Sequence, residues 1–266
     1  MDNMGLIEEI PVPIFYTPIK CNNPVIVHNH STRVEVNLDT SSGGNKVEVS
    51  YNNGEDYGRV LANYIKKFID MLSEYIAEEY FSIEINIDKP VYGLGLYAFI
   101  TTLLLKEMDL PDDEVLRACS IIDEKIVSDP VRLMVLKALR TSVLLGTSII
   151  YRGGEKPVEL NIEKNFVITK HLRHDDRSVV TELFNEQAFR AAVIHLGGYT
   201  AIALAKCCIA GLECSKLLTE SLIVFNSLQY MVKGVTPPLD GVLLDDLPGY
   251  LSLLVLEDDV SERDSG

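Results

Sequence analysis

Gly93 and Gly95 form a turn that has the chemistry to bind an anion. They follow residues 81–87, where apolar and polar side chains alternate as in a strand, and they precede the apolar run at residues 99–107, which predicts a buried helix. Glycine has no Cβ atom, so backbone N–H groups in such a turn can approach a phosphate, and the dipole of the following helix favours the negative charge. The same spacing suits a tight turn packed under a core helix, so the glycines alone leave both interpretations open.

A second candidate site is the segment HLRHDDR at residues 171–177, which holds two arginines, two histidines and two aspartates. The segment follows a predicted strand at residues 166–170, and the planar guanidinium groups of Arg173 and Arg177 suit carboxylates and phosphates. This indicates a site for an anionic substrate. The alternative is a solvated loop between two domains.

The elements that must position these residues are strands in the first part of the chain and helices after them. Period-two alternation predicts strands at residues 33–39, 46–51, 81–87, 166–170 and 250–258. Apolar spacings of three and four predict helices at residues 57–80, 110–126 and 130–145, and a long helical region at residues 178–228, interrupted near Gly197, Gly198 and Gly211. The SSGG turn between the first two strands predicts that they form an antiparallel hairpin.

Composition limits the classes of partner. The net charge of −15, with no cluster of lysine or arginine, disfavours nucleic acid and anionic membranes. No apolar run reaches the roughly 18 residues that span a bilayer, so we expect a cytoplasmic protein that does not contact the membrane. Five cysteines without a CxxC pair predict reduced, buried thiols.

The order of elements and one motif resemble the GHMP family of small-molecule kinases. The segment PVYGLGLYA places Pro90, Gly93, Leu94, Gly95 and Ala98 on the family's phosphate-loop pattern, and LPDDEVLRACSIIDE and LGTSIIYRGGEKPVEL are similar to the segments that follow it. The similarity covers about residues 11–166. It implies an α+β fold with a ribosomal-S5-like N-terminal α/β domain at residues 1–163, a helix-rich C-terminal α+β domain at 164–258 and an acidic tail at 259–266. It also implies ATP and Mg²⁺ as cofactors, a small-molecule anion as ligand, and leaves a homodimer open.

The resemblance assigns roles to individual residues. It implies that Glu124, or Asp123 beside it, binds magnesium and that Asp129 is the catalytic residue, although Asp129 before Pro130 also suits an ordinary helix N-cap. Lys20 would match the family's N-terminal substrate stretch. The nucleotide loop would comprise Gly93, Leu94, Gly95, Leu96, Tyr97 and Ala98.

Two departures from the family pattern bear on function. Leu96 and Tyr97 stand where the family has two serines that line the phosphate site, and leucine cannot bind magnesium. Asp245 and Asp246 lie in the segment that matches the family's third, glycine-rich turn, where carboxylates would repel a triphosphate. We therefore expect a divergent member with a degraded ATP and magnesium site, weakly active or non-catalytic, acting as a binding or partner subunit. The alternatives are an ATP-dependent kinase for a hydroxy acid such as pantoate, shikimate or mevalonate, and a protein that binds an acidic metabolite without nucleotide.

Overall fold

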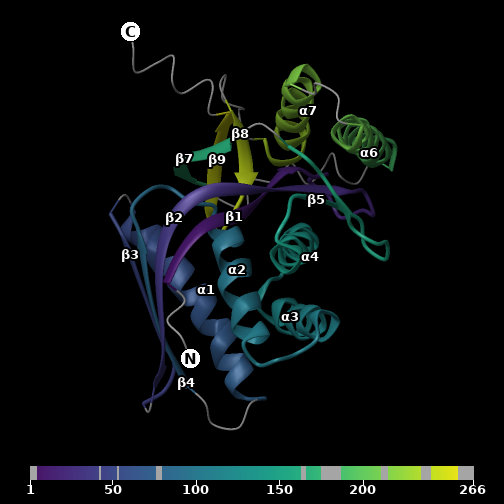
Figure 1. The fold of residues 1–266 in the computed structure, drawn as a ribbon. Helices are drawn as coiled ribbons and strands as arrows, with labels where there is room; N and C mark the ends of the chain where they lie inside the picture. The colour runs from purple at the N-terminus through teal and green to yellow at the C-terminus, as the bar shows by residue number, and fades with distance from the viewer. Residues whose placement is uncertain are drawn as a thin grey trace.

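The structure is a computed structural model that describes residues 5–41, 43–52, 54–75, 80–162, 166–174, 187–210, 215–234 and 241–256. Arg177, the start of the long helical region and the acidic tail lie outside these residues. Two sheets organise the described part, with helices beside each (Figure 1). The α+β fold class is confirmed, whereas the domain boundary at residues 163 and 164 stays a prediction.

The larger sheet has six strands in the order β3-β4-β2-β5-β6, with β1 also paired to β2. Its strands are β1 (Gly5–Phe15), β2 (Val25–Ser41), β3 (Lys46–Tyr51), β4 (Tyr80–Ile87), β5 (Ile149–Tyr151) and β6 (Val158–Glu159). β2 is a long central strand that pairs antiparallel with β1, β4 and β5. The first strand, β1, was not predicted from the sequence.

The predicted hairpin between β2 and β3 is wrong, because β4 lies between these two strands. β4 pairs antiparallel with β2, with Val34 opposite Ile87, and parallel with β3, with Val47 opposite Ile83. The helix α1 (Glu55–Ser73) joins β3 to β4, and a parallel pair needs such a crossover connection. The period-two alternation correctly predicted that these segments are strands, but it does not indicate which strands pair with each other.

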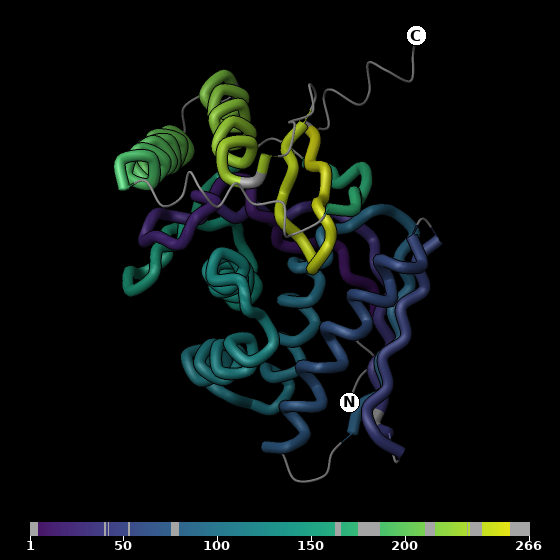
Figure 2. Tube along the Cα trace, turned by 180° about the vertical axis from the view of Figure 1, so that it is seen from behind, coloured from purple at the N-terminus to yellow at the C-terminus, as the bar shows by residue number. Residues whose placement is uncertain are grey.

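Four helices, α1 to α4, lie against one side of the larger sheet (Figures 1 and 2). After α1 they are α2 (Gly93–Lys106), α3 (Asp112–Ile126) and α4 (Pro130–Leu145), close to the predicted ranges. α2 begins at Gly93 itself, so the two glycines belong to the first turn of the helix. Its side chains are buried on nearly all sides, as its apolar sequence predicted.

The second sheet has three strands in the order β7-β9-β8, and two helices lie near it (Figure 1). These elements are β7 (Phe166–Arg173), α6 (Gln187–Ile209), α7 (Ser215–Lys233), β8 (Val242–Asp245) and β9 (Tyr250–Leu256). Gly197 and Gly198 lie inside α6 and do not interrupt it. A Cβ atom on Gly197 would lie 2.4 Å from the Thr17 hydroxyl oxygen, so close packing explains this glycine.

Buried apolar side chains from both sheets form one large core, which includes Phe15, Phe166 and Phe225. Within the described residues, α6 is the one helix long and apolar enough to cross a membrane by length and composition, contrary to our expectation that no segment would pass this test. Cys21, Cys119 and Cys208 carry free thiols, as predicted, but Cys207 is disulfide-bonded.

Candidate functional site

The predicted anion site at the start of α2 holds a carboxylate of the chain itself. Asp246 lies in the turn between β8 and β9, and its Oδ1 accepts a hydrogen bond of 2.8 Å from the backbone N–H of Leu94. Its Oδ2 accepts a bond of 3.3 Å from the N–H of Gly93. Tyr92, the N-cap residue, makes no side-chain cap bond, so Asp246 caps α2 from a distant part of the chain. The β8–β9 hairpin reaches down to α2 in Figure 1.

Two hydroxyl groups complete the surroundings of this carboxylate. The Tyr57 hydroxyl donates to Oδ2 at 2.6 Å, and the Ser252 hydroxyl also donates to Oδ2. Asp246 is fully buried. Burial, and after it the nearby Asp246 charge, raises the pKa of Tyr57 well above its usual value, so this hydroxyl stays a donor. The negative charge is thus stabilised by neutral donors and a helix dipole.

His171 adds an aromatic group beside Asp246. Its ring stacks on Tyr57 with 3.7 Å between centroids, and its Nδ1 lies 2.9 Å from the Ser252 oxygen. Nδ1 is also 3.9 Å from Asp246 Oδ2. Burial lowers the pKa of His171, and the Asp246 charge opposes part of that effect. The neutral ring is therefore favoured, with Nδ1 placed to donate to Ser252.

Packing within the chain accounts for both glycines of the turn. A Cβ atom on Gly93 would lie 2.3 Å from the Tyr57 hydroxyl oxygen, and one on Gly95 would lie 2.1 Å from the carbonyl oxygen of Pro11. Neither approach leaves room for a side chain. The alternative interpretation of the glycine pair, a tight start to a packed helix, is therefore sufficient to explain it.

Leu96, Tyr97 and Ala98 have fully buried side chains. The Tyr97 hydroxyl donates to Asp123 Oδ1 at 2.7 Å, inside the bundle formed by α1 to α4. Arg140 pairs with the same carboxylate through two bonds, Nε to Oδ2 at 2.8 Å and Nη2 to Oδ1 at 2.9 Å. The residues at the family's serine positions thus belong to a buried core, and Asp123 has an arginine as its partner.

Glu124 and Asp129 do not converge on a shared ion. The Glu124 carboxylate is exposed and pairs with Lys137 at 3.5 Å. Asp129 is the N-cap of α4, where its Oδ1 accepts bonds of 2.7 Å from Val131 N–H and 3.4 Å from Arg132 N–H. In the described part of the chain, no group of three or more potential metal-ligating side chains comes together. Glu124 and Asp129 thus do not form a preassembled carboxylate cluster.

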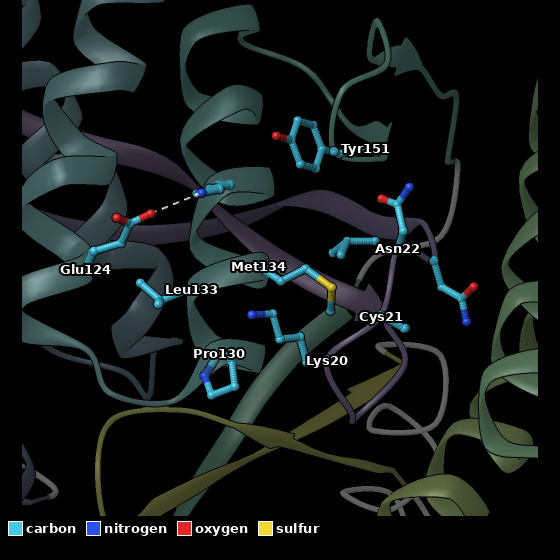
Figure 3. Close-up of a pocket in the computed structure, with 12 residues that line it drawn as sticks. Lys20, Cys21, Asn22, Glu124, Pro130, Leu133, Met134 and Tyr151 are labelled. Atoms are coloured by element: carbon cyan, nitrogen blue, oxygen red, sulfur yellow. Dashed lines mark ion pairs between the residues drawn. The ribbon is translucent and has the colours of Figure 1, made fainter. Parts of the chain in front are cut away.

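Lys20 lies at a cleft of about 230 Å³ near the start of α4. Lys137 and Glu124 also line this cleft, as do the amide side chains of Asn22 and Asn23. Figure 3 shows Lys20, Met134 and Asn22 around the cleft, with Glu124 at one end. None of its lining residues comes from the first turn of α2. The Lys20 prediction thus falls in a polar cleft separate from the Asp246 cap.

Arg173 lies at a different cleft, of about 630 Å³, which borders the Asp246 cap. Its exposed guanidinium group pairs with Asp56. Tyr51, Tyr57 and His171 give this cleft an aromatic wall. The structure therefore separates Arg173 from Lys20, and the role predicted for Arg177 concerns a residue outside the described part.

Asp245 forms a second buried contact between the two sheets. Its Oδ1 accepts a bond of 3.0 Å from Arg132 at the start of α4, and its backbone N–H donates to the Tyr16 hydroxyl at 3.1 Å. The Tyr92 hydroxyl donates to its carbonyl oxygen at 2.8 Å. Arg132, Tyr57 and Tyr16 were not identified from the sequence. Their partners lie more than a hundred residues away along the chain, and no local sequence pattern indicates such contacts.

No protein-family model matches this sequence, and no curated protein matches it by sequence. Solved structures do match its fold. A mevalonate kinase from L. major in complex with R-mevalonate aligns with a TM-score of 0.63 at 12% identity, over 98% of this chain and 90% of that one. A Streptococcus pneumoniae phosphomevalonate kinase in complex with phosphomevalonate and AMPPNP gives 0.60 at 10% identity, over 98% and 95%.

A third match comes from another branch of small-molecule kinases. The Lactococcus lactis galactokinase complexed with galactose aligns with a TM-score of 0.58 at 14% identity, over 97% of this chain and 86% of that one. At such identities a match concerns architecture and leaves substrate and activity open. The alignments nevertheless extend over nearly the full length of each partner, and the neighbours share one superfamily. The chain therefore has the fold of the GHMP-kinase superfamily.

Proposed function

We propose that this protein is a GHMP-kinase-fold protein that does not transfer phosphoryl groups. The observation that carries the proposal is the bond of 2.8 Å from Leu94 N–H to Asp246 Oδ1. A phosphate at the same turn would compete with a buried carboxylate for the same donors. Two negative groups sharing one such position repel each other by about 4 kcal/mol at 4 Å near a protein surface.

The partners of the residues expected to bind metal support the same proposal. Phosphoryl transfer relies on positioning and on neutralising charge with a metal and cationic groups. Leu96 offers no ligand atom, and the Tyr97 hydroxyl is bonded to Asp123 in the core. With Asp123 paired to Arg140 and Asp129 acting as a helix cap, the acidic residues expected to serve ATP and Mg²⁺ have structural partners.

Calorimetric titration of ATP, with and without Mg²⁺, tests the proposal on the wild type and on Asp246→Ala. We expect no binding to the wild type and measurable binding once the carboxylate is removed. Asp70→Asn is the control, because it removes one charge from an exposed ion pair on α1, which pairs Asp70 with Lys66. Should Asp246→Ala fail to fold, the isosteric Asp246→Asn removes the charge and keeps an acceptor oxygen.

Magnesium-dependent ATP binding by the wild type would overturn the proposal. It would favour the alternative of an ATP-dependent kinase, and screening hydroxy acids as phosphoryl acceptors would follow. The same titration therefore separates the two functions that share this fold.

A second candidate function is nucleotide-independent binding of a small acidic metabolite. The observation that favours it is the cleft near α4, where Lys20 and Lys137 supply cationic groups and Asn22 and Asn23 supply amides. Thermal-shift measurements with small hydroxy acids test this function. If the hydroxy acid stabilises the wild type and the Lys66→Met control on α1 but not Lys20→Met, the result supports this function. If only Arg173→Ala loses the stabilisation, the ligand binds in the cleft that Arg173 lines.

A further inference from the structure

The first half of β1 is an open edge of the larger sheet. β1 pairs with β2 on one side, and within the described residues no strand pairs with its other side. At Pro11 the start of α2 packs against β1, because a Cβ atom on Gly95 would lie 2.1 Å from the Pro11 carbonyl oxygen. Before Pro11 the strand is mostly exposed. We call residues 5–10 the β1 edge, because their backbone groups on this side can pair with another strand.

A groove of about 320 Å³ lies between the β1 edge and α2, which run beside each other (Figure 1). It is lined by Leu6, Ile7, Glu8, Glu9, Phe99 and Leu103. Phe99 and Leu103 lie one turn apart on α2, and both are half-buried. An open strand edge beside an apolar surface is the arrangement to which an extended peptide adds as a further strand. Backbone hydrogen bonds then hold the peptide, and alternate side chains enter the groove.

The charge of the groove indicates which kind of segment it can bind. Glu8 and Glu9 are exposed, and neither takes part in an ion pair among the residues that the structure describes. The chain has a net charge of −15, so the same edge of a second copy would bring two more carboxylates and be repelled. Nucleic acid and anionic lipid would be repelled as well. Basic side chains would be attracted.

We propose that this groove binds an extended segment of another protein, in which apolar and basic residues alternate. The segment adds one strand to the larger sheet at the β1 edge. Its apolar side chains contact Phe99 and Leu103, and its basic side chains lie near Glu8 and Glu9. Pro11 has no N–H group to donate, so the added ladder ends before it. This interaction is independent of whether the start of α2 binds a nucleotide.

NMR titration of the backbone amides with synthetic peptides tests the proposal. The probe alternates lysine and valine over about six residues, the length of an ordinary strand. One control peptide has all its lysines before all its valines, and the other alternates glutamate and valine. We expect the probe to bind with a Kd of about 1 mM and to shift signals of the β1 edge and of α2. Absence of binding, equal binding of either control peptide, or shifts confined to other parts of the chain would overturn the proposal.

Charge reversal separates specific binding from general attraction to an acidic protein. Glu8→Lys combined with Glu9→Lys should weaken binding of the probe about tenfold. The control combines Glu48→Lys with Glu84→Lys, because these exposed residues lie opposite each other on β3 and β4 and their reversal changes the net charge equally. We expect the control to bind as the wild type does. Equal weakening in both double variants would show that the probe does not bind in the groove.

A leucine pair tests the apolar contact in the same way. Leu6 lines the groove and Leu145 ends α4, and each is 45% exposed. Leu6→Ser should weaken binding of the probe about fivefold, because less apolar surface is buried, and Leu145→Ser should leave it unchanged. The proposal is wrong if Leu6→Ser binds the probe as tightly as Leu145→Ser does.

Methylation of the probe tests whether it adds to the sheet as a strand. Successive amides of a strand point to opposite edges, so methylating the lysine amides or the valine amides blocks one edge at a time. We expect one methylated probe to lose binding, because its blocked edge faces β1, and the other to keep it. Two methylated probes that both bind, or that both fail to bind, would overturn the proposed strand addition.

Discussion

Two buried carboxylates in this protein are stabilised in opposite ways. Asp123 pairs with Arg140 through two hydrogen bonds, inside the bundle of α1 to α4. Asp246 has the N–H groups of Gly93 and Leu94 and two hydroxyls as donors, and it joins the second sheet to α1 and α2. The first is a neutral pair. The second is a negative group held by a helix start, which is the arrangement that binds phosphate in other proteins. The difference is between an ion pair in the core and a helix start that is capped by a carboxylate of the chain itself.

The largest expected effect comes from breaking the neutral pair. Arg140→Met leaves the Asp123 charge buried without its cation, so we expect the free energy of unfolding to fall by about 4 kcal/mol. Urea denaturation at neutral pH measures it. The double variant Arg140→Met, Asp123→Leu should recover much of the loss, because a buried pair can be replaced by apolar groups. If the double variant is no more stable than Arg140→Met alone, the loss in Arg140→Met does not come from the unpaired Asp123 charge.

Removing the other carboxylate should cost slightly less. Asp246→Ala leaves two N–H groups and two hydroxyls buried without their acceptor, and we expect a loss of about 3 kcal/mol by the same urea method. Asp129→Ala is the matched comparison, since Asp129 also accepts from two backbone N–H groups at a helix start but is only half-buried. Its expected loss is about 1 kcal/mol. Equal losses of unfolding free energy at the two positions would show that the deeper burial of Asp246 does not add to the cost of removing it.

Each carboxylate has a tyrosine donor, and this permits a smaller, matched test. Tyr57→Phe removes a donor from Asp246, and Tyr97→Phe removes one from Asp123. We expect Tyr57→Phe to cost about 2 kcal/mol and Tyr97→Phe about 1 kcal/mol, because Asp123 keeps its arginine. Thermal and urea unfolding of both variants measures the ranking. The reverse order would show that the Tyr97 hydroxyl stabilises the Asp123 carboxylate more than Arg140 does.

The smallest effect concerns His171. Burial keeps its pKa below the unfolded value of about 6.5, so its contribution to stability is complete above that pH and is lost as the pH falls below it. Asp246 opposes the shift, and Asp246→Asn should therefore lower the pKa of His171 further. NMR titration of the His171 ring protons measures it. A pKa that rises in Asp246→Asn would mean that Asp246 does not act on this ring through its charge.

The helices of the N-terminal part were readable from the sequence because their apolar positions repeat with the helical period. Leu61, Ile65 and Phe68 on α1 are examples, and all three are buried. The pairing of β3 with β4 was not readable, since period-two alternation says which face is buried and nothing about the neighbouring strand. β8 was also missed, because its apolar residues and the following acids were interpreted as a single turn.

The candidate site was predicted in part. Gly93 and Gly95 located the start of α2, and Asp245 and Asp246 were noted as unfavourable to a triphosphate, whereas the nucleotide-binding role of the turn stays a prediction. That Asp246 itself would be the negative group could not be read from the sequence, because the contact depends on how the second sheet docks on the first. The roles assigned to Lys20, Asp129 and Glu124 stay predictions.

The cap on α2 also has a consequence for the order in which the chain can fold. Leu94 and Asp246 are separated by 152 positions, so the turn that carries Asp246 is synthesised long after α2 begins. Contacts between such distant segments form slowly, because a long loop must close first. During synthesis the first turn of α2 therefore stays without its acceptor until the β8–β9 turn has been made. We therefore expect the first sheet and its helices to complete their folding only when the β8–β9 hairpin docks, and the two sheets to unfold as one cooperative unit.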